Sequence, residues 1–152
     1  MKGACEELKE HMYTVGEARQ ADRYTKTTEQ IVNYIQRTYE DGQDVKDALV
    51  HLEDVDLEEE RPENEEDEEN LSYMEKLILQ QEVKEFIARK KKYKNNMNKA
   101  CALILGQCTQ AVKNKLEAKD NWEQIEADHN PIELLKAIKA ITQDYQDSKY
   151  PI

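Results

Sequence analysis

The sequence is poor in residues that break, turn or cross-link a chain. It holds four glycines, three prolines and three cysteines among 152 residues. So few turn-forming residues are unlike the composition of proteins built from many short β-strands. Three cysteines form an odd set without metal-ligand spacing, which does not resemble a secreted disulfide scaffold. These absences favour an all-α protein of a reducing compartment.

Long apolar runs are also missing. The longest, from Ala100 to Gly106, is far shorter than the roughly 20 residues that a membrane-spanning helix needs. The first residues, MKGACEELKEHM, lack the apolar core of a secretory signal peptide. We therefore expect a cytoplasmic protein that makes no use of a membrane.

The net charge of -11 is confined to one segment. Residues 53–69 contain twelve acidic residues and a single basic one, Arg61, so the rest of the chain is electrically balanced. A dedicated nucleic-acid binder needs an excess of Lys and Arg on some surface, which this composition does not supply. The segment is also nearly free of apolar residues, and its like charges repel one another. We therefore predict a flexible acidic linker over 53–70, and a calcium-binding or partner-docking tract is the alternative.

The N-terminal part, residues 1–52, is expected to form short helices. A first helix is predicted over about 4–12, with a break near Gly16. Thr27 and Gln30 have the spacing of a capping box, which predicts a helix that begins there and ends near Asp41. A further short helix over about 44–52 could fold back on it as a hairpin.

The C-terminal part, residues 71–152, opens with the strongest pattern in the chain. Ser72 and Glu75 form another capping-box pair, and neither Gly nor Pro follows before Leu105. This predicts one helix roughly 50 Å long. One face of it repeats in steps of four and three, as in a coiled coil. We call this face the seam; its members are Leu79, Val83, Phe86, Lys90, Tyr93, Met97, Ala100 and Ile104.

Shorter helices are expected after the long one. A helix resumes near Cys108, and a brief helical turn contains Trp122. Asn130 as cap, followed by Pro131 and Glu133, marks the start of the last helix. The expected architecture is a helical bundle built on one long amphipathic helix. Its expected packing or interface residues are Leu79, Val83, Phe86, Tyr93, Met97, Ile104, Leu135 and Ile138.

No combination of residues in the sequence predicts catalysis, a metal site or a cofactor. The three histidines, His11, His51 and His129, fall in different expected elements, and no nucleophile motif accompanies any of them. Cys101 and Cys108 are expected to be buried small hydrophobic residues. No glycine-rich phosphate loop is present. The chain is therefore predicted not to be an enzyme.

A short basic run interrupts the acidic character midway along the long helix. It could be a solvated helix face paired with the acidic linker, or it could contact nucleic acid, anionic lipid or an acidic partner. Both interpretations remain open at this stage. The run comprises Arg89, Lys90, Lys91, Lys92 and Lys94.

Several phrases of the C-terminal part resemble a known family. They are the long charged helix leading into ALILGQC, the short helix with VKNKL, and the phrase NPIELLKAIK followed by YQDSKYP. Together they resemble the Gag-like capsid region of copia-type LTR retrotransposons, in particular the Gag open reading frames of algae and diatoms. The resemblance covers residues 72–151. It implies an all-α protein that assembles into particles around element RNA, without enzymatic activity.

Two features of that family are missing, namely further capsid helices and a zinc knuckle with its Cys-x-x-Cys start. The chain is therefore expected to be a piece, or a derivative, of a longer polyprotein. Its expected partner is itself, as a homo-oligomer, or another helical protein, with RNA as a further candidate. The alternative function is a cellular helical adaptor or regulatory module, in which the long helix presents a ridge or groove to a partner helix.

Overall fold

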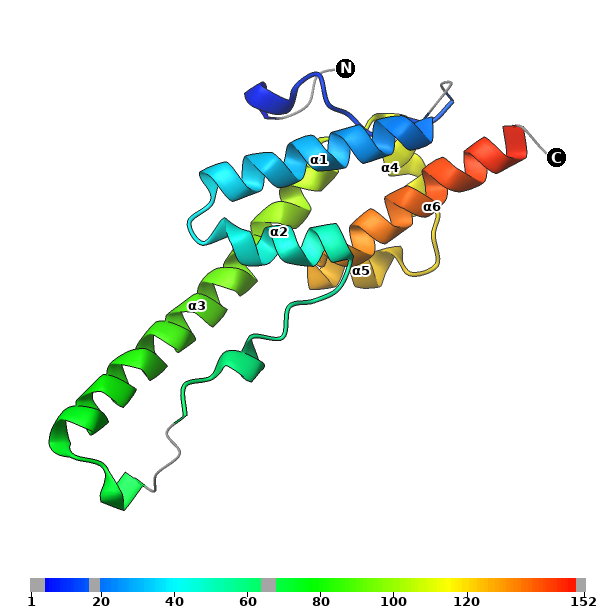
Figure 1. The fold of residues 1–152 in the computed structure, drawn as a ribbon. Coiled ribbons are helices and arrows are strands. Elements are labelled where there is room, and N and C mark those ends of the chain that lie inside the picture. The colour runs from blue at the N-terminus through cyan, green and yellow to red at the C-terminus, as the bar shows by residue number, and fades with distance from the viewer. Residues whose placement is uncertain (1–4, 17–19, 64–67, 150–152) are drawn as a thin grey trace.

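The computed structural model describes residues 5–16, 20–63 and 68–149, and it is mostly helical (Figure 1). The predicted all-α class is thereby confirmed. None of the helices in these ranges is long and apolar enough to cross a membrane. In chain order the elements are the 3-10 turn η1 (Glu6–Leu8), α1 (Gln20–Thr38), α2 (Gly42–His51), the 3-10 turns η2 (Leu57–Glu60) and η3 (Glu68–Asn70), α3 (Tyr73–Gly106), α4 (Gln110–Glu117), α5 (Trp122–Asp128) and α6 (Pro131–Lys149).

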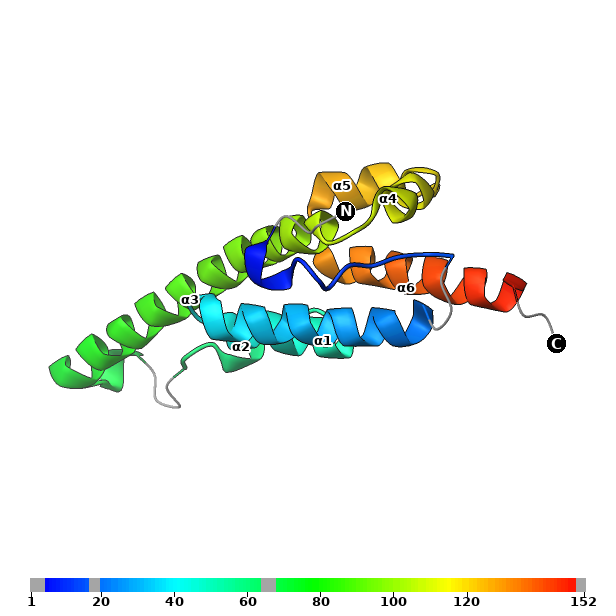
Figure 2. The ribbon, with the colours of Figure 1, turned by 90° about the horizontal axis from the view of Figure 1, so that it is seen from above.

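The long helix α3 agrees with its prediction at both ends. Ser72 is its N-cap, and the Ser72 hydroxyl accepts a hydrogen bond from the backbone N–H of Glu75 at 3.1 Å. The helix runs for 34 residues and ends at Gly106. Its C-terminal half lies within the bundle, whereas its N-terminal half projects beyond the other helices (Figures 1 and 2).

The central element of the bundle is α6, which contacts α1, α2, α3 and α4. Its predicted start is confirmed, because Oδ1 of Asn130 accepts from the backbone N–H groups of Ile132 at 3.0 Å and Glu133 at 3.3 Å. Leu135 and Ile138 on this helix are almost completely buried. Figure 2 shows α1 and α2 on one side of α6 and α4 and α5 on the other.

The helices α1 and α2 pair with each other and pack on α6. Ile35 of α1 and Val45 of α2 belong to the same hydrophobic core as Ile104 and Ile138. The first and third of the three predicted parts therefore share one core. The turn between α1 and α2 is tight, since a Cβ added to Gly42 would lie 2.5 Å from the carbonyl oxygen of Ile35.

The N-terminal helix predicted over about 4–12 is wrong in its described part, where only the short turn η1 is helical. The chain then runs extended, and Tyr13 forms an isolated parallel β-bridge with Cys108. The N–H of Tyr13 donates to the carbonyl oxygen of Gln107 at 2.8 Å. This segment satisfies its polar backbone groups at the α3–α4 turn, so it does not need helical hydrogen bonds.

The predicted cap at Thr27 is also wrong. The helix α1 begins at Gln20, and Thr27 lies within it with only 2% of its surface exposed. Its hydroxyl donates to the carbonyl oxygen of Met12 at 3.3 Å. The Thr27 side chain therefore does not cap a helix. It hydrogen-bonds the extended segment that contains Met12.

Candidate interaction surface on the projecting arm

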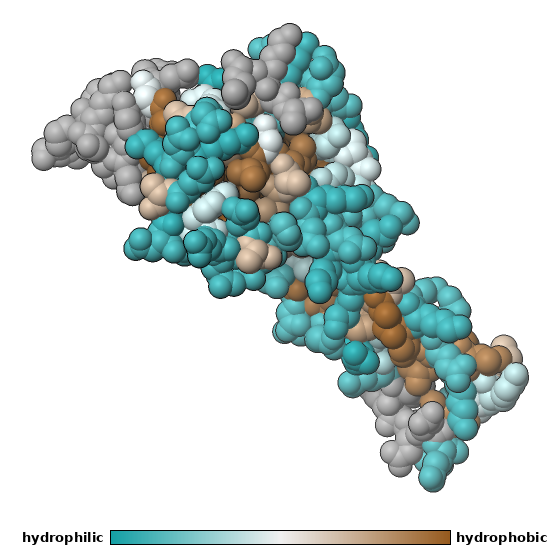
Figure 3. Space-filling model, turned by 180° about the vertical axis from the view of Figure 1, so that it is seen from behind, coloured by the Kyte–Doolittle hydropathy of each residue, from teal (hydrophilic) through white to brown (hydrophobic). Residues whose placement is uncertain are grey.

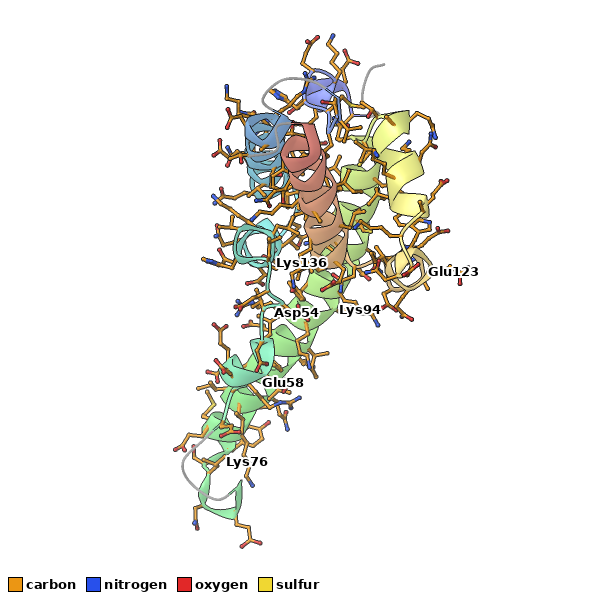
Figure 4. The ribbon with its side chains drawn as sticks, turned by 90° about the vertical axis from the view of Figure 1, so that its right-hand side faces the viewer. Asp54, Glu58, Lys76, Lys94, Glu123 and Lys136 are labelled. Carbon is orange, nitrogen blue, oxygen red and sulfur yellow. The ribbon has the colours of Figure 1, made fainter. Side chains whose placement is uncertain are left out.

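The segment that follows α2 lies along the projecting half of α3. Figure 1 shows it beside the helix, and Figure 4 shows Asp54 and Glu58 on it. We call residues 53–63 the acidic segment, and we call this segment together with residues 73–93 of α3 the arm. The flexible linker expected over 53–70 therefore needs correction for residues 53–63, which make specific contacts with the helix. Residues 68–70 form the turn η3, and residues 64–67 lie outside the described residues.

The acidic segment runs antiparallel to α3, with its first contact at Tyr93. The Tyr93 hydroxyl donates to the carboxylate of Asp54, and its oxygen accepts from the backbone N–H of Val55 at 3.2 Å. Burial, followed by the bond to Asp54, raises the pKa of Tyr93 above its ordinary value. Tyr93 therefore stays a protonated donor and fastens the start of the segment to the helix.

The next contacts of the acidic segment lie progressively closer to the N-terminal end of α3. Glu58 pairs with Lys90, and Glu60 pairs with Arg89. The guanidinium of Arg61 lies over the ring of Phe86, 5.2 Å from its centroid. Lys90, followed by Arg61, lowers the pKa of the Glu58 carboxyl by hydrogen bonding to its charged form.

Two apolar side chains are buried beside these ion pairs. Leu57, at the start of η2, is only 4% exposed, and Phe86 of α3 is 5% exposed. Neither belongs to the core of the bundle. Val55 and Glu58, on the two sides of Leu57, contact α3, so Leu57 is buried within the stretch of the segment that lies along that helix.

Most cations of the basic run on α3 form ion pairs with carboxylates of the same chain. Arg89 makes a two-pronged pair with Asp44 of α2, at 2.9 Å from Nε and 2.7 Å from Nη2. Asp44, followed by Glu60, raises the pKa of Arg89. Lys92 pairs with Glu40 at 2.9 Å and lowers the pKa of that carboxyl.

Of the five predicted nucleic-acid or acidic-partner contacts, Arg89, Lys90 and Lys92 are thus engaged in ion pairs. Lys91 and Lys94 are exposed (Lys94 is labelled in Figure 4). A contact with RNA remains a prediction. The other interpretation was a helix face paired with the acidic linker. It agrees with the ion pairs that Lys90 makes with Glu58 and Arg89 makes with Glu60.

The predicted packing residues lie mainly inside the molecule. Leu79, Val83 and Tyr93 are partly covered. The remaining predicted residues are buried, namely Phe86, Met97, Ile104, Leu135 and Ile138. These residues therefore pack within the chain, and another surface has to be considered for contacts with partners.

That other surface is an apolar patch on the arm. Tyr73 is 76% exposed, Met74 63% and Ile87 55%. Figure 3 shows brown, apolar side chains along the projecting end of the molecule. Exposed apolar groups that cluster along one stretch of a helix mark contact surfaces in soluble proteins. We call this surface the apolar patch; it consists of Tyr73, Met74, Leu77, Ile78 and Ile87.

The seam did not predict the apolar patch, because the patch residues lie outside the seam. A signal was present: Tyr73, Met74, Leu77 and Ile78 fall within six positions of a single helix. Residues with this spacing point to more than one side of a helix, so the seam cannot bury them all.

A cavity of about 360 Å³ lies where the acidic segment and α3 meet the start of α6. Tyr93, Lys94 and His129 are among its lining residues, which include neither Ser nor Cys. Elsewhere, burial raises the pKa of the Cys108 thiol to about 12, which suppresses its thiolate. In the described ranges no group of three or more His, Cys, Asp or Glu residues could hold a metal ion.

Comparison with models of protein families, with curated proteins and with solved structures finds no match. The geometry of the arm is therefore the basis for a function.

Proposed function

We propose that this chain is a non-enzymatic assembly protein of the cytoplasm that associates with copies of itself through the apolar patch on its arm. The observation that carries the proposal is the position of the patch. It lies on the half of α3 that projects from the bundle, where a second molecule can reach it from several sides. Burial of apolar surface stabilises association by roughly 25 cal/mol for each Å² removed from water.

The resemblance to a Gag-like capsid region supports the same role. A capsid protein acts through repeated contacts between helical subunits, and it needs no reactive pocket. The helical bundle with one projecting helix suits that use, because a rigid rod carries its contact surface away from the core. RNA packaging is not part of the proposal, since three of the five cations of the basic run already have acidic partners within the chain.

Light scattering coupled to size-exclusion chromatography, from about 10 µM to about 1 mM protein, tests the proposal. The mass of the wild-type chain should rise with concentration. Two double variants, Met74→Glu with Ile78→Glu and Leu77→Glu with Ile87→Glu, change different sides of the patch. At least one of them should stay a monomer over the whole range, because it places carboxylates in the contact.

Val50→Glu is the matched control, because Val50 is 55% exposed but lies on α2, away from the arm. This variant should associate as the wild type does. A wild-type chain that stays monomeric at the highest concentration would contradict self-association. If it instead captured one helical protein stoichiometrically, the adaptor function would be favoured.

A further inference from the structure

We propose that the face of α3 between Phe86 and Tyr93 is a binding site for an acidic, leucine-bearing peptide segment of a partner protein, and that residues 54–61 of this chain occupy it in cis. The site lies under the acidic segment and is separate from the exposed apolar patch. The inference therefore goes beyond the proposed self-association and does not depend on it.

The chemistry of the face defines the ligand. Lys90 and the Nη1 atom of Arg89 offer two cations to carboxylates. Tyr93 offers a hydroxyl donor at one end, and the ring of Phe86 lies at the other. A ligand that satisfies these groups carries carboxylates, and the burial of Leu57 in the cis segment adds an apolar side chain between them.

The acidic segment has that composition. Its contacts place Asp54 at Tyr93 and Glu58 at Lys90, and the buried Leu57 lies between these two points. A nucleic acid could supply negative charge to the same cations, but it has no aliphatic side chain to replace Leu57. Arg89 would also keep its pair with Asp44, which belongs to α2 and not to the segment. The face thus fits an acidic peptide better than a nucleic acid.

The bound segment is also easy to displace. The four side chains in the Glu58–Lys90 and Glu60–Arg89 pairs are between 39% and 59% exposed. Ion pairs that are open to water are weak and are screened by salt. Only Leu57 anchors the middle of the segment by deep burial. Local opening of such a segment requires far less free energy than unfolding of the bundle.

The segment therefore acts as a built-in competitor. Because it is tethered next to its site, its effective concentration there is on the order of millimolar. A partner peptide binds at full strength only when the segment has been released. The cis contact thus raises the concentration of external acidic peptide that is needed to bind α3.

A fluorescently labelled synthetic peptide of residues 53–63, followed by fluorescence anisotropy, is the probe. An opened variant of the full chain carries Asp54→Ala, Leu57→Ser, Glu58→Gln and Glu60→Gln, which remove the buried leucine of the segment and the contacts of its carboxylates with Tyr93, Lys90 and Arg89. It should bind the peptide at least about tenfold more tightly than the wild type does, because it lacks the tethered competitor. Glu59→Gln is the matched control: Glu59 is exposed, and its replacement should leave the wild-type affinity unchanged.

Two further variants locate the site. Lys90→Glu added to the opened chain should abolish the gain, and a peptide with Ser in place of Leu57 should bind the opened chain at least about tenfold more weakly. Circular dichroism should show that all variants keep their helices.

Equal affinity of the opened and wild-type chains for the peptide would overturn the proposal, and so would an unchanged affinity after Lys90→Glu. Tight binding of a single-stranded oligonucleotide with no binding of the peptide would overturn it in favour of nucleic acid. Light scattering on the opened variant keeps the two proposals apart, because its apolar patch is intact and its self-association should be that of the wild type.

Discussion

The side-chain amide of Gln107 donates a hydrogen bond to the carbonyl oxygen of Leu8 at 2.6 Å, across 99 positions of sequence. The same nitrogen donates to the carbonyl oxygen of His11 at 2.7 Å. Gln107 follows the last residue of α3 and is fully buried. One polar side chain at the end of the long helix therefore holds the extended N-terminal segment in place.

Gln107→Ala should lower the free energy of unfolding by about 1 to 3 kcal/mol, because it removes the hydrogen bonds of a fully buried amide to the carbonyl oxygens of Leu8 and His11. Urea denaturation followed by circular dichroism measures the loss. Gln110→Ala is the control, since Gln110 is exposed and its side chain bonds Asn114 one turn further along α4. It should change the free energy of unfolding by less than about 0.5 kcal/mol. Equal effects of the two substitutions would show that the N-terminal segment is not held by Gln107.

The turn between α1 and α2 gives a second prediction. A Cβ at position 42 would lie 2.5 Å from the Ile35 carbonyl oxygen and 3.2 Å from the Tyr39 Cβ. Both are backbone or near-backbone atoms that cannot rotate away. Gly42→Ala should therefore force α1 and α2 apart and destabilise the chain by about 1 to 3 kcal/mol.

The helix propensity of alanine alone would predict the opposite, a gain of roughly 1 kcal/mol. The sign of the change in the urea midpoint thus decides between local propensity and the close approach of the two helices. Gln43→Ala, at the next and exposed position, is the control and should leave the midpoint close to that of the wild type.

The features of the fold that the sequence predicted are those encoded locally. Ser72 with Glu75, and Asn130 with Glu133, form their caps within three residues, so spacing alone reveals them. Thr27 has the same local form, yet its hydroxyl bonds Met12, fifteen positions away. A capping pattern contains no information about a distant carbonyl group that accepts from the same hydroxyl. Gln107, whose partners lie almost a hundred positions away, gave no local signal at all.

The arm was predicted only in part, for a related reason. The seam indicated that α3 would be covered along its length, but not by what. Composition suggested that the acidic segment would stay flexible, because like charges repel and few apolar residues are present. Its antiparallel path brings Glu58 to Lys90 and buries Leu57. These stabilising contacts depend on how the acidic segment and α3 lie relative to each other. Periodicity within one helix does not contain that information.

The pair of Arg89 and Asp44 gives a third prediction. Asp44 is only 8% exposed, and its two carboxylate oxygens accept from Nε and Nη2 of Arg89. Arg89→Ala leaves this carboxylate partly desolvated and without its donor, so the free energy of unfolding should fall by about 1.5 to 3 kcal/mol. Arg89→Lys should recover only part of the loss, because an ammonium cannot match both oxygens at once.

Urea denaturation of these two variants and of Lys91→Ala provides the measurement. Lys91 is exposed and lies two positions from Arg89, so its loss controls for the removal of one positive charge from α3. It should change the free energy of unfolding by less than about 0.5 kcal/mol. If Arg89→Ala proved no more damaging than Lys91→Ala, the pair would have no structural role in joining the arm to α2.

Cys108 provides a prediction about alkaline pH. Its burial raises the pKa of the thiol from an ordinary value of 9.0 to about 12. Above pH 9.0 the thiol ionises in the unfolded chain but not in the folded one, so the unfolded state gains stability as the pH rises. The contribution of Cys108 to the free energy of unfolding is therefore fully present below pH 9.0 and is lost progressively towards about pH 12.

Cys108→Ala removes this titration, although the smaller side chain lowers stability at every pH. Between about pH 9.5 and pH 11 the variant should lose up to about 1.4 kcal/mol less per pH unit than the wild type, the limit for one proton. Tyr39, whose partial burial raises its pKa to about 12, contributes equally to both chains and cancels in the comparison. Parallel curves of unfolding free energy against pH would show that the Cys108 thiol reaches water and ionises in the native state.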